Sequence, residues 1–146
     1  MPTSAGTRLD ACREEPARGG PDAIRFVHAP AEATGLPGGS FDMVSMCLTA
    51  HELPQAATQA ICREALRLLR PGGVFAIMDM DPEAPEFRRI LDNVFAYTAF
   101  RSTEPWLGDY ATLDVHASLR DAGFARTMQR ACSPKHRAIV GIKDAA

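Results

Sequence analysis

Residues 41–80 decide the fold, and they read FDMVSMCLTAHELPQAATQAICREALRLLRPGGVFAIMDM. Phe41–Leu48 is nearly continuous in apolar residues, which is typical of a strand buried on both faces of a parallel sheet. From about Pro54 to Leu69 apolar residues recur at helical spacing, and Pro71-Gly72-Gly73 ends that helix. Val74–Met80 repeats the buried-strand pattern. Strand, helix and strand in succession predict a right-handed βαβ unit with two parallel strands.

Weaker signals precede this unit. Ile24–His28 is a β-prone run that predicts a further strand, and Leu36–Ser40 predicts a turn. Residues 29–35 are small and polar and compatible with a helix. Residues 1–23 are rich in Gly, Pro, Arg and Ala, so we expect a disordered leader or a wrongly assigned start of translation. Residues 24–146 then form one domain.

The sequence after the unit predicts two helices, a loop between them and a closing hairpin. These are a helix over 85–99, a loop over 102–111, a helix from Thr112 to Asp121 ended by Gly123, and antiparallel strands over Ala125–Ala131 and Arg137–Ile142.

Composition excludes several classes of protein. The chain has 146 residues and a formal net charge of -2, without a Lys/Arg run, so we expect no nucleic-acid partner. No apolar run approaches the roughly 20 residues that span a bilayer. A secretory segment is also lacking, which predicts an intracellular protein, cytoplasmic by default with an organelle not excluded. The cysteines form no C-x-x-C pair, which favours buried free thiols in a reducing compartment.

Three segments together resemble the later part of a class I S-adenosylmethionine-dependent methyltransferase domain, of the small-molecule, type 11-like branch. They are AEATGLPGGSFD (31–42), LLRPGG (68–73) and DAGF (121–124), and the resemblance covers about residues 24–143. It implies an α/β fold with a partial Rossmann-like methyltransferase sheet, whose strands are mostly parallel and end in an antiparallel hairpin. It also implies S-adenosyl-L-methionine as cofactor and a small molecule as methyl acceptor.

The resemblance implies a truncated domain as well. The family begins with a strand and a glycine-rich turn for the methionine part of the cofactor, and an acidic residue after its second strand binds the ribose. Neither pattern is recognisable here. Those two strands lie, in the family, between Ile24–His28 and Phe41–Leu48, so the edge of Phe41–Leu48 would be exposed. We expect the sheet to close over the gap, a missing N-terminal half or a protein partner to fill it, or the fragment to be unstable alone.

Cofactor residues are expected at the carboxyl ends of the strands, where open α/β sheets bind ligands. After the first strand, relatives carry an Asp that accepts from the adenine amino group. Pro30 stands there, so the backbone N–H groups of Ala31 and Glu32 remain as contacts, unless the segment is only a tight turn. Leu48 and Thr49 follow the second strand, where the family's chain runs beneath the methyl group.

Catalytic residues are expected next to that turn. His51 is a candidate general base, since imidazole changes charge near neutral pH, and Glu52 could orient it or bind substrate. Alternatively, His51 packs against or caps the following helix. Gln55 stands where H-E-x-x-H would need its second histidine, so that zinc motif is absent. The remaining histidines have no ligand-like partners at close spacing, and we predict no metal site.

Three residues are candidates for substrate contact. Asp79 ends the later strand, and its alternatives are capping of the next helix or solvation. Trp106 and Tyr110 lie in the predicted loop, where relatives build a lid over the acceptor, and core packing is the alternative for both.

Two functions follow from these features. One is methyl transfer to a small molecule as part of a larger or incomplete enzyme. The other is a non-catalytic methyltransferase-like remnant that binds a partner, which the missing glycine-rich turn and Pro30 favour. A nicotinamide dehydrogenase is disfavoured because no dinucleotide fingerprint is present.

Overall fold

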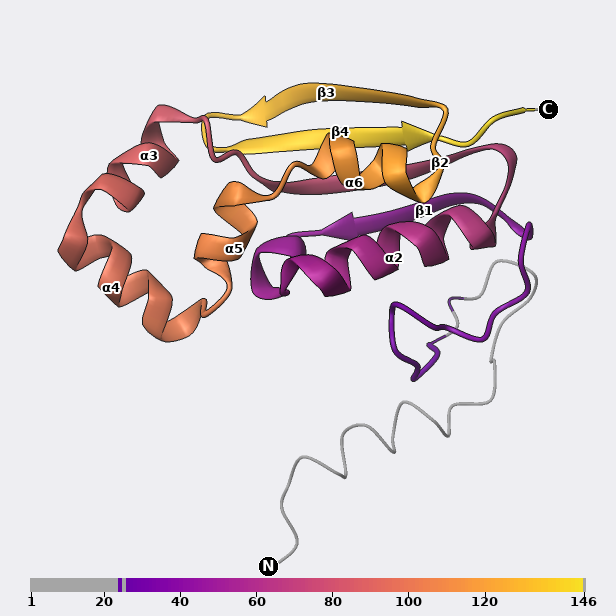
Figure 1. Ribbon diagram of the computed structural model, residues 1–146, viewed down its shortest axis with the longest axis horizontal. Helices are drawn as coiled ribbons and strands as arrows, with labels where there is room; N and C mark the ends of the chain where they lie inside the picture. The colour runs from indigo at the N-terminus through magenta and orange to yellow at the C-terminus, as the bar shows by residue number, and fades with distance from the viewer. Residues whose placement is uncertain (1–23, 25, 146) are drawn as a thin grey trace, which may run out of the picture.

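The computed structural model describes residues 24 and 26–145 of the chain. In these residues it is an α/β fold with one four-stranded sheet of order β1-β2-β4-β3 (Figure 1). The strands are β1 (Phe41–Cys47), β2 (Leu69–Met80), β3 (Arg126–Ser133) and β4 (His136–Ile142). The helices are the 3₁₀ helix η1 (Ala50–Glu52), α2 (Gln55–Leu68), α3 (Pro85–Asp92), α4 (Val94–Thr103), α5 (Leu107–Thr112) and α6 (Val115–Ala122).

The predicted βαβ unit is confirmed. β1 and β2 pair in parallel, from Met43 opposite Val74 to Cys47 opposite Met78, and α2 connects them. β2 begins at Leu69, earlier than the predicted Val74, because Leu69 pairs with Phe41 before the register shifts. The part of β2 between Leu69 and Val74 contains Gly72, whose φ of 76° lies in the left-handed region that glycine adopts without a steric penalty.

The core lies between the sheet and the two helices α2 and α6, which cover the same face (Figure 1). α2 contributes Ile61 and Ala65 to it because its apolar residues recur every three or four positions. On the sheet, Phe75 is fully buried and stacks on Phe124 with ring centroids 6.0 Å apart. Burial of such large side chains supplies about 1.5–3 kcal/mol each, which holds the layers together.

The closing hairpin is also confirmed, since β3 and β4 pair antiparallel and β4 pairs antiparallel with β2. The helix before it starts later than predicted. Thr112 ends α5, and Asp114 caps α6 by accepting a hydrogen bond from the N–H of Ala117 at 2.9 Å. Gly123 ends α6 as predicted, with a φ of 110°.

The region between β2 and α6 is more helical than predicted. The helix expected over 85–99 is two helices, α3 and α4, which Asn93 separates. Its side chain accepts from the N–H groups of Phe95 and Ala96, both at 3.0 Å, and thereby starts a second helix. The loop expected over 102–111 contains the end of α4 and all of α5 except its last residue, Thr112. Burial of Leu107 and Tyr110 stabilises α5, which local sequence could not indicate.

The strand predicted over Ile24–His28 is wrong for the described residues 24 and 26–28, which lie in no strand. Ile24 and Phe26 are 82% and 73% exposed. A strand exists through hydrogen bonds to a neighbour, and no described strand lies beside this segment. Residues 29–35 form no helix either, but a turn that the N–H of Ala33 closes on the carbonyl of Pro30 at 3.1 Å. The predicted leader, residues 1–23, lies outside the described residues.

β1 is not buried on both faces, contrary to the sequence pattern. It forms one edge of the described sheet, and Met43 on it is 57% exposed. Met43, Val74 and Val140 lie on the face opposite α2 and α6, and no helix of the described chain covers that face. Among the described residues the outer edge of β1 is unpaired, as expected, and the sheet is mixed, with β1 and β2 parallel and the pairings of β4 antiparallel.

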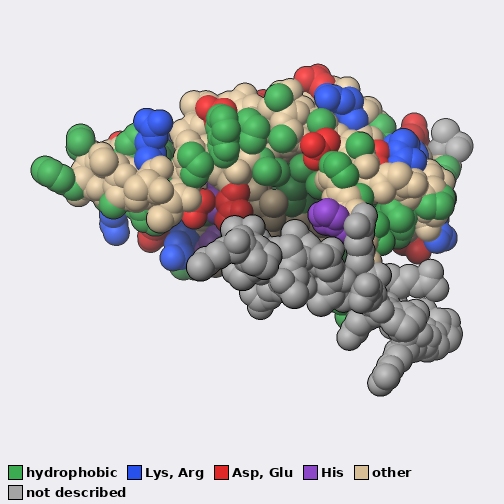
Figure 2. Space-filling view, turned by 90° about the horizontal axis from the view of Figure 1, so that it is seen from below, with side chains coloured by type: hydrophobic (Ala, Val, Ile, Leu, Met, Phe, Trp, Pro, Cys, Tyr) green, Lys and Arg blue, Asp and Glu red, His purple; other side chains and the backbone are tan. Residues whose placement is uncertain are grey.

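Hydrophobic side chains also reach the surface at the far end of the molecule. α4 has no buried residue, and its Val94 and Phe95 are 74% and 88% exposed. Figure 2 shows hydrophobic side chains projecting from this end. Within the part of the chain that the structure describes, no helix combines the length and the hydropathy needed to cross a membrane. Cys47, Cys62 and Cys132 are free thiols as predicted, but only Cys62 is buried, whereas Cys47 and Cys132 are exposed.

Candidate functional site

A turn of unusual backbone follows β1. Leu48 has a φ of 49°, and it is the one non-glycine residue with positive φ in the described chain. Side chains other than glycine rarely adopt this region, and such residues cluster at functional sites. The N–H of Leu48 donates to the carbonyl of Met78 at 2.8 Å, so the end of β2 holds the turn. The chain then enters η1, which carries His51 and Glu52.

Asp79 anchors this turn from β2. Its Oδ2 accepts from the N–H groups of Thr49 at 3.2 Å, Ala50 at 2.8 Å and His51 at 3.4 Å. The first N–H groups of any helix lack intrahelical partners, and a carboxylate there satisfies them and opposes their partial positive charge. Asp79 is only 1% exposed, so this anchor is buried.

The other oxygen of Asp79 orients His51. Oδ1 lies 2.6 Å from Nδ1 of the imidazole, and His51 is 7% exposed. Since an ionised carboxylate can only accept, Nδ1 donates in this bond and the lone pair of the neutral ring is on Nε2. The same Oδ1 accepts from the N–H of Met80 at 2.7 Å. The pair therefore presents Nε2 as a fixed basic atom.

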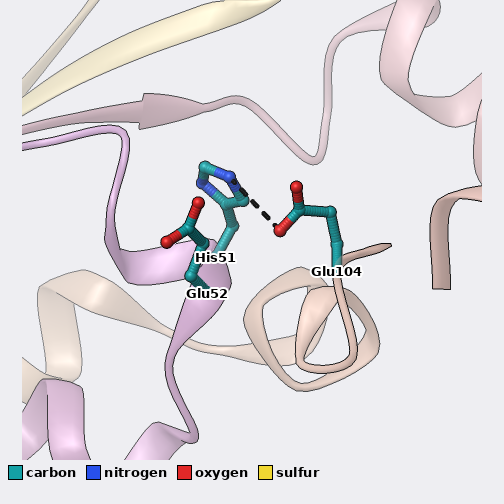
Figure 3. A group of neighbouring side chains, drawn as sticks. All are labelled: His51, Glu52 and Glu104. Carbon is teal, nitrogen blue, oxygen red and sulfur yellow. Dashed lines mark ion pairs between the residues drawn. The ribbon is translucent and has the colours of Figure 1, made fainter. Parts of the chain in front are cut away.

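Two glutamates lie near the imidazole, and one of them faces Nε2. Oε2 of Glu104, which follows α4, lies 3.9 Å from Nε2 of His51. Glu52 is exposed and projects from η1 beside the imidazole, so three side chains from two elements converge (Figure 3). One ligand atom from each of the three lies within 4.8 Å of the others. Sequence analysis missed Glu104, because no motif or spacing links it to His51.

Tyr110 forms the wall behind His51. Its ring meets the imidazole edge-on, with centroids 6.2 Å apart, and its hydroxyl donates to the carbonyl of Met80. Burial raises the pKa of Tyr110 far above its usual value, and the negative charge of Asp79 adds to the effect. Tyr110 and Asp79, each 1% exposed, have no surface for a substrate in this conformation. Trp106 is 41% exposed and therefore has surface that a substrate could contact.

A cavity of about 490 Å³ lies on the β1 side of the same turn. Its lining includes Ala31, Glu32 and Thr49, three of the five residues predicted to bind cofactor, and most of its wall is apolar side chains of β1 and α2. The volume suits a small-molecule site. Pro30 and Leu48 are not part of the lining. His51 is not either, although Thr49 and Leu53 on both sides of it are.

Glu64 of α2 holds one wall of this cavity in place. Its Oε1 accepts from the N–H and the hydroxyl of Thr34, at 3.0 and 2.6 Å, and its Oε2 accepts from Nε of Arg67 at 2.7 Å. The bonds from Arg67, followed by those from Thr34, lower the pKa of Glu64 to about 2. The segment that carries Ala31 and Glu32 is thereby tied to α2.

Comparison with known proteins identifies the family. Residues 5–77, half of the chain, match the methyltransferase domain family. An uncharacterized methyltransferase from Synechocystis is 36% identical over 55 residues, which are 38% of this chain and 26% of that protein. The chain thus spans about a quarter of the length of this curated relative.

Solved structures agree on the fold. A SAM-dependent methyltransferase from Thermotoga maritima, described as a possible histamine N-methyltransferase, has a TM-score of 0.57 at 19% identity over 78% of this chain and 61% of its own. An O-methyltransferase family protein from Burkholderia thailandensis has a TM-score of 0.59 at 20% identity over 84% of this chain and 36% of its own. At such identities the likeness concerns the fold alone. Because the family match covers half of the sequence and the fold agrees, the chain belongs to the methyltransferase domain family, with the fold of the class I S-adenosylmethionine-dependent methyltransferases.

Proposed function

We propose that the chain is part of an S-adenosylmethionine-dependent methyltransferase that acts on a small-molecule acceptor. The observation that carries the proposal is the arrangement at the carboxyl end of β1. There, one turn borders the cavity through Thr49 and carries His51, which pairs with the buried Asp79 of β2. Family membership makes S-adenosylmethionine the expected cofactor.

The cavity fits part of this cofactor. Its apolar wall suits a flat aromatic base, and the backbone N–H groups of Ala31 and Glu32, which line the cavity, are proposed as donors to the ring. Pro30 offers no side-chain acceptor to an amino group. Thr49 and Leu48 would border the methyl end. When bound, the cofactor supplies a methyl group on a positively charged sulfur.

His51 is proposed to take up the proton that methylation of a hydroxyl or amine releases. The acceptor atom would take the methyl group from the bound cofactor, whose carbon–sulfur bond breaks so that S-adenosylhomocysteine is left. The proton of the acceptor atom would move to Nε2 of His51, and Asp79 at Nδ1 would stabilise the imidazolium that results. Asp79 is thus proposed as a positioning residue that acts through His51, not as a substrate contact. We propose that Glu52 orients the acceptor and that Trp106 covers it.

Cofactor binding is tested with two neighbouring alanines of α2. Ala57 lines the cavity, whereas Ala56 is exposed. We expect the 146-residue chain to bind S-adenosylhomocysteine in calorimetry, Ala57→Trp to abolish this binding by filling the cavity, and Ala56→Trp to retain it. Circular dichroism checks that both variants fold. Absence of binding to the unaltered chain, or equal binding by both variants, would contradict the proposed cofactor site.

The roles of His51 and Asp79 are tested by kinetics on an acceptor identified with labelled S-adenosylmethionine. His51→Gln should lower kcat by about 10²–10⁴-fold, the usual contribution of a general base. Asp79→Asn should lower kcat with little change in KM, and adding it to His51→Gln should cost little more, because both changes disable one unit. Independent, multiplicative effects would show that Asp79 acts otherwise.

The alternative is a non-catalytic methyltransferase-like module that binds a partner. The exposed edge of β1 and the uncovered face beside it favour this function. Saturable binding of S-adenosylhomocysteine to the chain would count against it in its simplest form.

A further inference from the structure

We propose that His51, Glu104 and Glu52 bind a divalent transition-metal ion such as Zn²⁺ or Co²⁺. Sequence analysis predicts no metal site, because Glu104 is distant in sequence from the other two residues. The site emerges only where the residue after α4 meets η1 (Figure 3).

The spacing of the three side chains suits one ion. Ligand atoms that each lie about 2.1 Å from a tetrahedral ion are roughly 3.4 Å apart. Nε2 of His51 and Oε2 of Glu104 are 3.9 Å apart, and all three ligand atoms fall within 4.8 Å. Rotation of the Glu52 side chain, which is exposed, and of the Glu104 side chain, which is 24% exposed, brings the oxygens closer without moving the backbone.

His51 itself points to a ligand at this position. Its side chain is 9% exposed, and within the described residues Nε2 makes no hydrogen bond, since Glu104 at 3.9 Å is too far. The ring is nine-tenths buried and Nε2 is directed at the carboxylate of Glu104 (Figure 3), so a cation bound between these two groups would be a ligand common to both.

Asp79 prepares the imidazole for coordination. Metal-binding histidines commonly donate their second ring N–H to a carboxylate, which fixes the ring and raises its basicity. Asp79 does this through Oδ1 at 2.6 Å from Nδ1, while three backbone N–H groups hold its Oδ2. The ligand and its support are therefore present together, on two elements of the core.

Charge and donor type select the ion. Asp79, Glu52 and Glu104 carry negative charge around one imidazole. Arg137 faces Asp79 in register on β4, but its guanidinium lies 4.0 Å from Asp81. One nitrogen and two carboxylate donors favour Zn²⁺ or Co²⁺ over Mg²⁺ and Ca²⁺, which prefer oxygen ligands alone. Three protein ligands also leave a coordination position open.

Metal binding has a consequence for the same histidine. A coordinated Nε2 cannot accept a proton, so a bound ion would compete with the proposed role of His51 in methyl transfer. The site itself does not depend on that role, because metal binding is measured without cofactor or acceptor.

The test uses the tag-free, metal-stripped 146-residue chain. We expect calorimetry to show one saturable Zn²⁺ per chain, and Co²⁺ to give an absorption spectrum without a thiolate charge-transfer band. His51→Ala and Glu104→Gln should each weaken binding at least tenfold. Asp79→Asn should weaken it about 10–100-fold, the usual cost of losing the carboxylate behind a metal-binding histidine.

Two matched controls guard against binding at other surface groups. His116→Ala removes a histidine whose ring bonds Thr127 and Gln129, and Glu86→Gln removes an exposed glutamate of α3. Both should bind Zn²⁺ like the unaltered chain. Glu104 is half-buried and not part of the core, so Glu104→Gln should fold, and unchanged Zn²⁺ binding by this variant would overturn the proposal. A thiolate charge-transfer band in the Co²⁺ spectrum would also overturn it, because it would assign the ion to cysteine.

Discussion

A single buried carboxylate joins the two parts of the candidate site. Asp79 holds the start of η1 with one oxygen and the imidazole of His51 with the other. The sequence places Asp79 at the end of a strand, as one of several acidic residues nearby, and does not distinguish a buried anchor from a solvated side chain. The difference arises because Leu48 turns the chain after β1 so that the N–H groups of η1 meet the end of β2.

Glu64 gives the chain a measurable pH dependence at the residue scale. Its pKa in the folded state, about 2, lies below the ordinary value of 4.5, so folding favours the ionised form. The stabilisation is complete above about pH 4.5 and is lost as the pH falls from there towards 2. Glu64→Gln should therefore flatten the dependence of the free energy of unfolding on pH in this range, measured by urea denaturation.

The exposed Glu86→Gln variant is the control for Glu64, and it should follow the pH dependence of the unaltered chain. Equal slopes for the unaltered chain and Glu64→Gln below pH 4.5 would contradict the role assigned to the bonds from Arg67 and Thr34.

At the scale of elements, α4 depends on its cap rather than on packing. It has no buried residue, and the Asn93 side chain accepts from the N–H groups of Phe95 and Ala96 in its first turn. Asn93→Ala should cost about 1 kcal/mol of helix stability. We expect faster hydrogen exchange in residues 94–103, with exchange in α2 unchanged. Asn93→Asp keeps an acceptor and should exchange like the unaltered chain. If exchange in α4 does not respond to Asn93→Ala, packing and not the cap holds this helix.

The end of α6 depends on Gly123 for two separate reasons. Its φ of 110° is strained for any other residue, and a Cβ there would lie 3.0 Å from Cδ2 of Leu66. Gly123→Ala should lower the free energy of unfolding by about 1–2 kcal/mol from the backbone alone, and by more with the contact. Gly39 has a φ of 64° and open space at its Cβ position, so Gly39→Ala should cost less. If chemical denaturation gives the same loss of unfolding free energy for Gly123→Ala and Gly39→Ala, the contact with Leu66 is unimportant.

At the scale of the whole molecule, the uncovered edge and face of the sheet predict self-association. Among the described residues, β1 has no strand on its outer side and presents the exposed Met43, and such edges pair with other chains unless a charge blocks them. Met43→Lys should reduce association at high protein concentration, measured by sedimentation velocity. Phe95→Lys removes an even more exposed hydrophobe from α4 and should reduce it less. A larger reduction of association by Phe95→Lys than by Met43→Lys would place the self-associating surface on α4 instead.

The sequence by itself determined the elements whose signals are local. The alternation of apolar runs and helical spacing in residues 41–80 predicted the βαβ unit, and Gly123 predicted the end of a helix. Both succeeded because hydrophobic periodicity and glycine conformation act within a few residues. It also located His51 at the carboxyl end of a strand, since strand order in an open α/β sheet restricts where ligands bind.

Only the tertiary structure decided which residues meet. Ile24–His28 has a strand-like composition but forms no strand in its described residues, because a strand needs a neighbour. Asp79, a candidate for substrate contact in the sequence, is buried and hydrogen-bonded to His51 in the structure. Glu104 entered the site without any sequence signal. These outcomes depend on hydrogen bonds, burial and charge between residues far apart in the chain, and packing brings such residues together where no local pattern records it.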